Sequence, residues 1–332
     1  MSETILQVEN LKKYFVTQKG FFKSKNKILK AVDGISLRIQ RGESFALVGE
    51  SGCGKSTVGR TILNLLAPTS GKVVFEGQIL YDMEDQIKLD KKSMFKLRKD
   101  MQLIFQDPYA SLDPRMPVGQ IVSEGIIKHG LANHKEALEL AAQMLALCGL
   151  EGDVMRRYPH EFSGGQRQRI GIARALVLRP KFIVADEPIA ALDVSIQAQI
   201  LNLMTELKAK FGLTYLFISH DLEVVRYFCD QVAVMYMGNI VEKVDTKTLY
   251  KVPLHPYTKA LISAIPKTHP KEEKKRILLK GEMPSPVNPP SGCKFHNRCP
   301  YAQEVCTKEE PVLEEERQGH WVACHRWQEI VS

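Results

Sequence analysis

The sequence predicts an α/β fold with a parallel sheet at its core, together with an antiparallel β subdomain, a helical subdomain and a small cysteine-containing C-terminal extension. Three apolar runs, 45–48, 182–185 and 215–218, are short and lack helical period, so we expect them to be buried strands. Glycine or polar residues follow each run. The ends of parallel strands share one edge of a sheet, where open α/β sheets bind ligands.

Length and composition allow one full α/β domain with an appendage. The 332 residues are 44% hydrophobic, enough for a sizeable core. No stretch reaches the roughly 18 consecutive apolar residues that cross a bilayer, and residues 1–5 do not resemble a signal peptide. The net charge of +8 suits a nucleotide, an anionic membrane or a nucleic acid equally. We expect a cytosolic chain that works at a membrane only through a partner.

The first 40 residues have β character. Strands are expected over 5–9 and 11–15, a lysine-rich interruption follows over 17–30, and alternating apolar and polar residues over 35–39 predict an antiparallel sheet with one solvated face. An aromatic residue here can stack on an adenine ring, although an aromatic residue in a strand more often belongs to the core.

The loop after the first buried strand has the composition of a P-loop and leads into a predicted helix over 58–63. Its residues are Gly49, Glu50, Ser51, Gly52, Cys53, Gly54, Lys55, Ser56 and Thr57. The glycines permit positive φ and let successive N–H groups converge on a polyphosphate, and the helix N-terminus adds partial positive charge. Lys55 supplies a charge to the β and γ phosphates, and the Ser56 hydroxyl coordinates Mg²⁺. The loop thus predicts a nucleoside triphosphate site.

The region from 71 to 150 combines a strand, a loop and helices. A short strand over 101–105 leads to Gln106, which opens a segment, 106–115, whose prolines and aspartates predict a loop. A glutamine there can reach a metal ion or a water, or can belong to an ordinary surface loop. Apolar residues at helical spacing from 118 to 150 predict two helices broken around Gly130.

A second helix start follows at Ser163-Gly164-Gly165-Gln166. Ser163 fits an N-cap, and the two glycines leave the first N–H groups unobstructed, so this is a second candidate phosphate-binding helix start. Taken alone, Ser-Gly-Gly is also a common linker sequence.

Charged side chains follow the last two buried runs. Asp186 and Glu187 follow the apolar run 182–185. Adjacent buried acids in a cleft cost stability unless they serve a function. We expect Asp186 beside the P-loop metal and Glu187 where water attacks. Asp193 opens a helix over 194–211, and His220 follows the strand over 215–218 at the same edge of the sheet.

In this order, the motifs resemble those of ABC transporter ATPases over residues 3 to about 245. The matching positions are Tyr14, Gly49–Thr57, Gln106, Phe162–Gln166, Asp186, Glu187, Asp193 and His220. The resemblance implies ATP as the nucleotide, with Tyr14 stacked on adenine. It implies that Lys55, Ser56 and Thr57 contact phosphate and Mg²⁺.

The same resemblance assigns roles to the remaining positions. Gln106 senses the metal and faces the membrane partner, Glu187 is the general base, and His220 is the γ-phosphate switch. In the family, the Ser163–Gln166 motif contacts ATP bound to the other subunit. The active site is therefore expected to be complete only in a head-to-tail dimer.

Finer details resemble the F-type ATP-binding subunits of oligopeptide and dipeptide importers. These details are the P-loop sequence, Ile104–Tyr109, Ala191–Gln199 and the tail. The resemblance implies two membrane-spanning subunits, a second ATPase of the D type and an external substrate-binding protein, with this chain on the cytoplasmic face and no nucleic acid partner. Relatives carry peptides, nickel or sugars. A soluble ABC ATPase acting on ribosomes or DNA is the alternative, but the chain has one cassette and no sustained heptad repeat.

We expect three parts: an ATPase domain over 1–265, a basic linker over 266–280 and a cysteine domain over 281–332. The last part holds Cys293, Cys299, Cys306 and Cys324, separated by five, six and seventeen residues. In a reducing compartment this favours a four-thiolate site, and the absence of tight C-x₂-C pairs favours 4Fe–4S over zinc. The alternative is a tail with free thiols. The other three cysteines are expected to be ordinary buried or loop residues.

Overall fold

The computed structural model describes residues 3–18, 27–266 and 276–331 and divides the chain into two compact units. The helical unit comprises 1–5, 39–43 and 89–218. The P-loop unit comprises 6–38, 44–88 and 219–332. Most of the predicted linker, 267–275, and most of the lysine-rich interruption, 19–26, lie outside the described residues.

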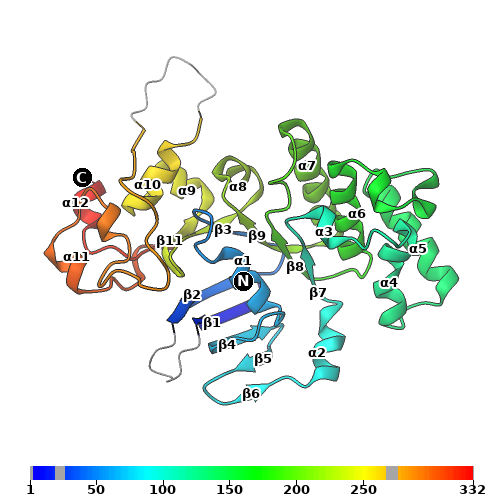
Figure 1. Cartoon of the computed structure of the whole chain (residues 1–332), viewed down its shortest axis with the longest axis horizontal. Helices are drawn as coiled ribbons and strands as arrows, with labels where there is room; N and C mark the ends of the chain where they lie inside the picture. Colours follow the sequence, from blue (N-terminus) through cyan, green and yellow to red (C-terminus); the bar gives the residue numbers. More distant parts are fainter. Residues whose placement is uncertain (1–2, 19–26, 267–275, 332) are drawn as a thin grey trace. The chain divides into compact units, whose positions relative to one another are not determined.

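The P-loop unit contains an antiparallel sheet of strand order β2-β1-β4-β5-β6 (Figure 1). These strands are β1 Thr4–Gln18, β2 Lys27–Gln40, β4 Ser70–Phe75, β5 Gln78–Asp82 and β6 Ile87–Lys88. The inward side chains alternate with outward ones, as in β4, so one face is buried and the other is not. The predicted antiparallel sheet is confirmed, with strands longer than the sequence pattern suggested.

A second set of strands in this unit carries the P-loop. β3 Ser44–Val48 pairs in parallel with β10 Gln231–Tyr236, and β11 Asn239–Asp245, β13 His320–Val322 and β12 Glu314–Arg317 follow as antiparallel neighbours. The helices are α1 Lys55–Ile62, α8 Leu222–Phe228, α9 Thr246–Lys251, α10 Pro256–Ser263, α11 Glu304–Lys308 and α12 Trp327–Val331, with a 3-10 turn at η4 His296–Arg298. The C-terminal extension thus adds two strands to the sheet that contains β3, the strand that leads into the P-loop.

In the helical unit, three parallel strands adjoin a group of helices. β8 Phe182–Asp186 lies between β7 Met101–Ile104 and β9 Thr214–Ser219. The helices are α2 Lys91–Arg98, α3 Pro108–Ser111, α4 Val118–Lys128, α5 His134–Leu147, α6 Gly164–Leu176 and α7 Val194–Phe211, with 3-10 turns η2 Asp153–Arg156 and η3 Pro159–Glu161. α4, α5 and α6 pack on one another. The parallel core strands and the helix break near Gly130 are confirmed.

One local expectation is wrong. Residues 108–111, predicted as loop, form the short helix α3, because Asp107 accepts a hydrogen bond from the Tyr109 N–H as N-cap and Pro108 occupies the first helical position. Proline indicates a turn in a sequence pattern, but its fixed φ also suits the first turn of a helix.

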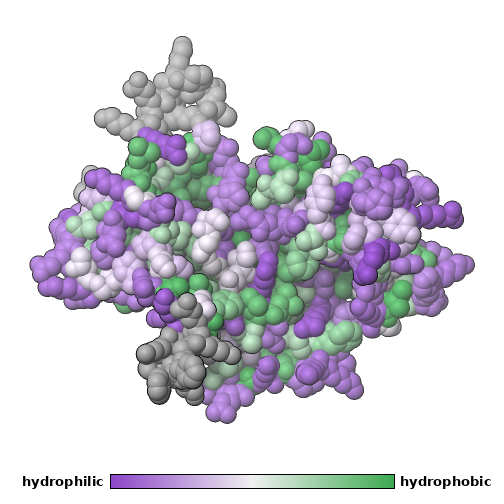
Figure 2. All heavy atoms as spheres, viewed as in Figure 1, coloured by the Kyte–Doolittle hydropathy of each residue, from purple (hydrophilic) through white to green (hydrophobic). Residues whose placement is uncertain are grey.

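The surface mixes polar and apolar residues. Figure 2 shows hydrophilic residues interspersed with small hydrophobic patches on the face in view. Among the described residues, no helix is long and apolar enough to cross a membrane.

Candidate active site

Close backbone contacts determine the path of the P-loop. Gly49 has φ 152° and Gly54 has φ 108°. A Cβ added at Gly49 would lie 2.2 Å from the Met235 carbonyl oxygen, and one at Gly54 would lie 2.0 Å from the Ala31 carbonyl oxygen. Only glycine fits such approaches, so the two glycines let the loop curl against β10 and β2.

Helix α1 begins inside this loop without a side-chain cap. Its N-cap is Gly54, which makes no side-chain capping hydrogen bond. Lys55 is only 4% exposed, and its ammonium donates to the Gly49 carbonyl at 2.9 Å and the Glu50 carbonyl at 3.1 Å. Ser56 and Thr57 follow in the first turn. An uncapped helix start with a cation beside it is a cradle suited to phosphate, and the Ser56 hydroxyl is a suitable ligand for Mg²⁺.

Tyr14 lies in β1 of the same unit, fixed at both ends. Its backbone N–H donates to Thr69 Oγ1 at 2.9 Å, and its hydroxyl donates to the Asp33 carboxylate. The Lys30 ammonium lies 5.5 Å from the centre of its ring. Burial, followed by the bond to Asp33, raises the pKa of Tyr14 above its ordinary value, so the phenol keeps its proton. Its adenine-stacking role remains a prediction.

The acidic pair lies at the end of β8 in the helical unit. Asp186 is the last residue of β8 and is 1% exposed, and Glu187 has a left-handed φ of 46°. The Glu187 N–H donates to the Ile218 carbonyl at 3.0 Å, which holds this unusual backbone beside β9. Such conformations cost about 1–3 kcal/mol in non-glycine residues and cluster at functional sites.

Gln106 contacts Glu187 directly. The Gln106 Nε2 donates to Glu187 Oε2 at 3.0 Å, so the second residue after β7 orients the carboxylate that follows β8. From the sequence, both residues are expected at strand ends, but no sequence pattern connects them. The shared strand edge was the signal available, since parallel neighbours end side by side. The metal contact predicted for Gln106 remains a prediction.

At the start of helix α6, Ser163 and Gln166 hydrogen-bond to each other. Ser163 Oγ accepts from the Gln166 N–H at 3.4 Å, while Gln166 Oε1 accepts from the Ser163 N–H at 3.0 Å. The predicted N-cap is confirmed as a capping box. Gly164 is the first helical residue, and a Cβ at Gly165 would lie 2.5 Å from Ile196 Cγ2, so α6 can approach α7 only with glycine there.

The other predicted positions divide between the units. His220 lies between β9 and α8, is exposed, and belongs to the P-loop unit with the loop itself and Tyr14. Asp193 caps α7 by accepting from the Ile196 N–H at 3.0 Å, and it belongs to the helical unit with Gln106 and the acidic pair.

The four C-terminal cysteines line one small pocket of about 20 Å³. Burial, with a smaller effect of neighbouring thiols, raises the pKa of Cys293 to about 12 and that of Cys324 to about 11, which favours neutral thiols. Within the described ranges, no group of three or more Cys, His, Asp or Glu side chains is arranged to hold a metal ion. The structure therefore does not show the expected 4Fe–4S cluster, which remains a prediction. The remaining cysteines, Cys53, Cys148 and Cys229, are buried as expected.

The P-loop geometry is that of a nucleotide-binding site, and comparison with known proteins identifies an ATP-binding cassette. The family model described as "ABC transporter" matches residues 32–190. The solved dimer of the cassette MJ0796 bound to ADP and Pi is similar, with a TM-score of 0.63 and 28% identity over 73% of this chain and 99% of that one. A structure of cbiO1 from Clostridium perfringens gives a TM-score of 0.62 and 30% identity over 75% of this chain and 91% of that one.

A second family model, the C-terminal region of oligopeptide/dipeptide transporters, matches residues 241–306. The oligopeptide transport ATP-binding protein AppF of Bacillus subtilis is 51% identical over 97% of both chains. The putative oligopeptide transport ATP-binding protein YkfD of the same organism is 52% identical over 97% of this chain and 95% of that one. The chain therefore belongs to the family of ABC transporter ATPase subunits for oligopeptides and dipeptides.

Proposed function

We propose that this chain hydrolyses ATP to power the import of oligopeptides or dipeptides through an ABC transporter. The observation that carries the proposal is similarity over nearly the full length to an oligopeptide transport ATP-binding protein. The chain would sit on the cytoplasmic face of the membrane with two permease subunits, a second, D-type ATPase and an external substrate-binding protein. A soluble role on ribosomes or DNA is not favoured by these relatives.

The P-loop supports the binding step. Lys55 would transfer its hydrogen bonds from the loop carbonyls to the β and γ phosphates of ATP, whose other oxygens would meet the N–H groups at the start of α1. Ser56 and Asp186 would hold Mg²⁺, which neutralises phosphate charge when bound. The proposed cradle also includes Gly49, Ser51, Gly52, Cys53, Gly54 and Thr57.

The chemistry is assigned to the strand ends. Glu187 would take the proton from the attacking water, and the bond from Gln106 keeps its carboxylate oriented. His220 would contact the γ phosphate, and Tyr14 would stack on adenine. In a head-to-tail dimer, Ser163, Gly164, Gly165 and Gln166 would contact the nucleotide held by the other ATPase. The dimeric state of the similar cassette MJ0796 supports this arrangement.

The proposed complex can be tested by purifying a tagged chain from gently solubilised membranes of its own organism. Two multi-spanning proteins and a second ATPase should copurify, and labelled oligopeptide uptake should stop when Glu187→Gln replaces the native chain. Recovery with ribosomes or DNA and without membrane proteins would overturn the transport role and leave the ATPase chemistry standing.

The four-thiolate site remains a finer proposal, supported by the convergence of four cysteine side chains on one pocket. A 4Fe–4S cluster would require all four as thiolates. Anaerobically purified protein should contain iron and acid-labile sulfide, which Cys299→Ser should reduce and Cys148→Ser should not. Zinc in place of iron and sulfide would assign a zinc site. The absence of both metals would indicate free thiols.

A further inference from the structure

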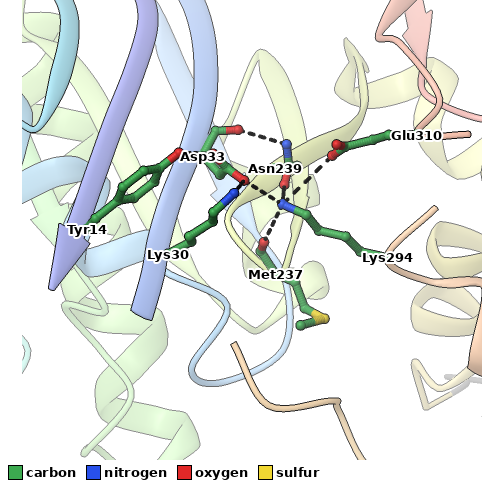
Figure 3. Close-up of polar contacts among 7 residues, drawn as sticks. All are labelled: Tyr14, Lys30, Asp33, Met237, Asn239, Lys294 and Glu310. Carbon is green, nitrogen blue, oxygen red and sulfur yellow. Dashed lines mark hydrogen bonds and ion pairs between the residues drawn. The ribbon is translucent and has the colours of Figure 1, made fainter. Parts of the chain in front are cut away.

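The extension segment 293–299 (Cys293 to Cys299) reaches the predicted nucleotide-binding residues at two points. The Lys294 ammonium donates to Asp33 Oδ2 at 2.9 Å and to the Met237 carbonyl at 3.5 Å, and it also bonds Asn239. Its side chain is 10% exposed. Figure 3 shows these oxygens gathered around the ammonium, with Glu310 at 3.8 Å. A lysine so enclosed has a fixed position.

Asp33 connects this lysine to Tyr14. The Tyr14 hydroxyl donates to the same Asp33 carboxylate that accepts from Lys294 (Figure 3). Burial opposes ionisation, but the bonds from Tyr14 and Lys294 keep the pKa of Asp33 below its ordinary value. Without Lys294, the remaining cationic partner of this carboxylate among the described residues would be the more exposed Lys30, at 3.6 Å. The orientation of the Tyr14 ring thus depends in part on the extension.

Arg298 makes the second contact, inside the P-loop. Its two terminal nitrogens donate to the two carboxylate oxygens of Glu50 at 2.8 and 3.1 Å, a bidentate pair in which the arginine is 9% exposed. Glu50 lies between Gly49 and Ser51. An unpaired carboxylate in a loop that binds polyphosphate would repel its ligand, so Arg298 offsets that charge and fixes the loop at once.

A buried aromatic residue, Phe295, fixes the segment that carries Lys294 and Arg298. Phe295, between them, is 1% exposed and packs edge-on against Tyr236 at 5.3 Å between ring centres. It also lies 5.5 Å from Tyr257, whose hydroxyl accepts from the Glu50 N–H at 2.8 Å. Because Phe295 is part of the unit's core, the segment presents Lys294 and Arg298 rigidly.

We propose that Lys294 and Arg298 are positioning residues for ATP: Lys294 acts through Asp33 on Tyr14, and Arg298 acts through Glu50 on the P-loop. This inference deepens the proposed function and rests on it. The competing explanation is that both residues only fasten the extension, with no effect on nucleotide binding.

The test is a titration of the full chain with a fluorescent ATP analogue, displaced by ATP, beside a melting curve for each variant. Arg298→Gln and Lys294→Met should each weaken ATP binding roughly ten-fold, as expected for a charge-assisted bond, and should raise KM more than they lower kcat. Lys308→Gln, which removes an exposed ion pair of the same extension, is the matched control and should bind ATP normally.

Two double variants separate positioning from fastening. If Lys294 acts through Tyr14, the effect of Lys294→Met on ATP affinity should largely vanish in a Tyr14→Phe background. If Arg298 acts by neutralising Glu50, Glu50→Gln should restore most of the affinity lost in Arg298→Gln. A conservative Arg298→Lys variant should retain part of the ATP affinity that Arg298→Gln loses, since lysine keeps the charge but cannot form the bidentate pair.

The outcomes are distinct. Native ATP affinity in both single variants, whatever their melting temperatures, would overturn the positioning role and leave the proposed function intact. Additive effects in both double variants would also overturn it. A wild-type chain that binds no ATP would overturn the proposed function and this inference together.

Discussion

Two helix starts in this chain look alike in sequence and differ in structure. Both α1 and α6 begin at glycine- and serine-containing loops, and both were predicted to bind phosphate. At α1, the N-cap is Gly54 and no side chain caps the first turn. At α6, Ser163 and Gln166 satisfy each other's backbone N–H groups.

The two kinds of N-cap determine how each helix start can bind a nucleotide. The α1 start is kept open by glycine and carries its own cation, Lys55, so it is organised for an anion in the single chain. The α6 start is internally satisfied, and a nucleotide there must compete with Ser163's own bond, which at 3.4 Å is long. This fits a site that another subunit's nucleotide completes.

Substitution of Glu187 tests the chemical step apart from nucleotide binding at either helix start. We expect Glu187→Gln to lower ATP turnover by about 10²- to 10⁴-fold, the range for loss of a general base, while ATP still binds. Steady-state kinetics measure ATP turnover, and an equilibrium titration measures ATP binding. Near-normal hydrolysis would remove Glu187 from its role and weaken the division between binding and chemistry.

The next effect tests the open start. We expect Lys55→Ala to lower kcat/KM for ATP by about 10²- to 10³-fold, because it removes a positioned charge from the uncapped α1 start. Kinetics at saturating Mg²⁺ measure it. A change below about three-fold would mean that the α1 start needs no cation, and the contrast with α6 would lose its basis.

A smaller effect tests the closed start. We expect Ser163→Ala to reduce hydrolysis by the assembled transporter about ten-fold and to cost about 1 kcal/mol of unfolding free energy, since the same hydroxyl caps α6. ATP binding to the isolated chain should stay normal. Weakened binding in the isolated chain would contradict the assignment of this start to the other subunit's nucleotide.

The smallest effect is the control. Helix α5 has the same kind of capping box, made by Asn133 and Glu136, and no predicted site residue. We expect Asn133→Ala to cost about 1 kcal/mol of unfolding free energy and to leave hydrolysis unchanged. Equal activity losses in this variant and in Ser163→Ala would reduce the role of Ser163 to capping.

Local patterns predicted much of this molecule. The P-loop, the strand end at Asp186 and the N-cap at Ser163 each follow from residues adjacent in sequence, where spacing determines geometry. The bidentate ion pair between Glu50 and Arg298 joins residues 248 positions apart, and no local sequence pattern can predict such a pair. The available signal was chemical: an acid inside a phosphate-binding loop requires a cation nearby.

The pairing of β13 with β11 has a consequence for the timing of synthesis. β11 ends at residue 245 and β13 begins at residue 320, so a ribosome adding about 5–20 residues per second needs roughly 4–15 s between them. During that interval, the edge of β11 has no partner from this hairpin, and the buried Glu242 lacks His320, which later contacts it at 2.7 Å. Unpaired strand edges invite pairing with other chains. The newborn ATPase therefore passes through an aggregation-sensitive interval, which ends when its last strands arrive.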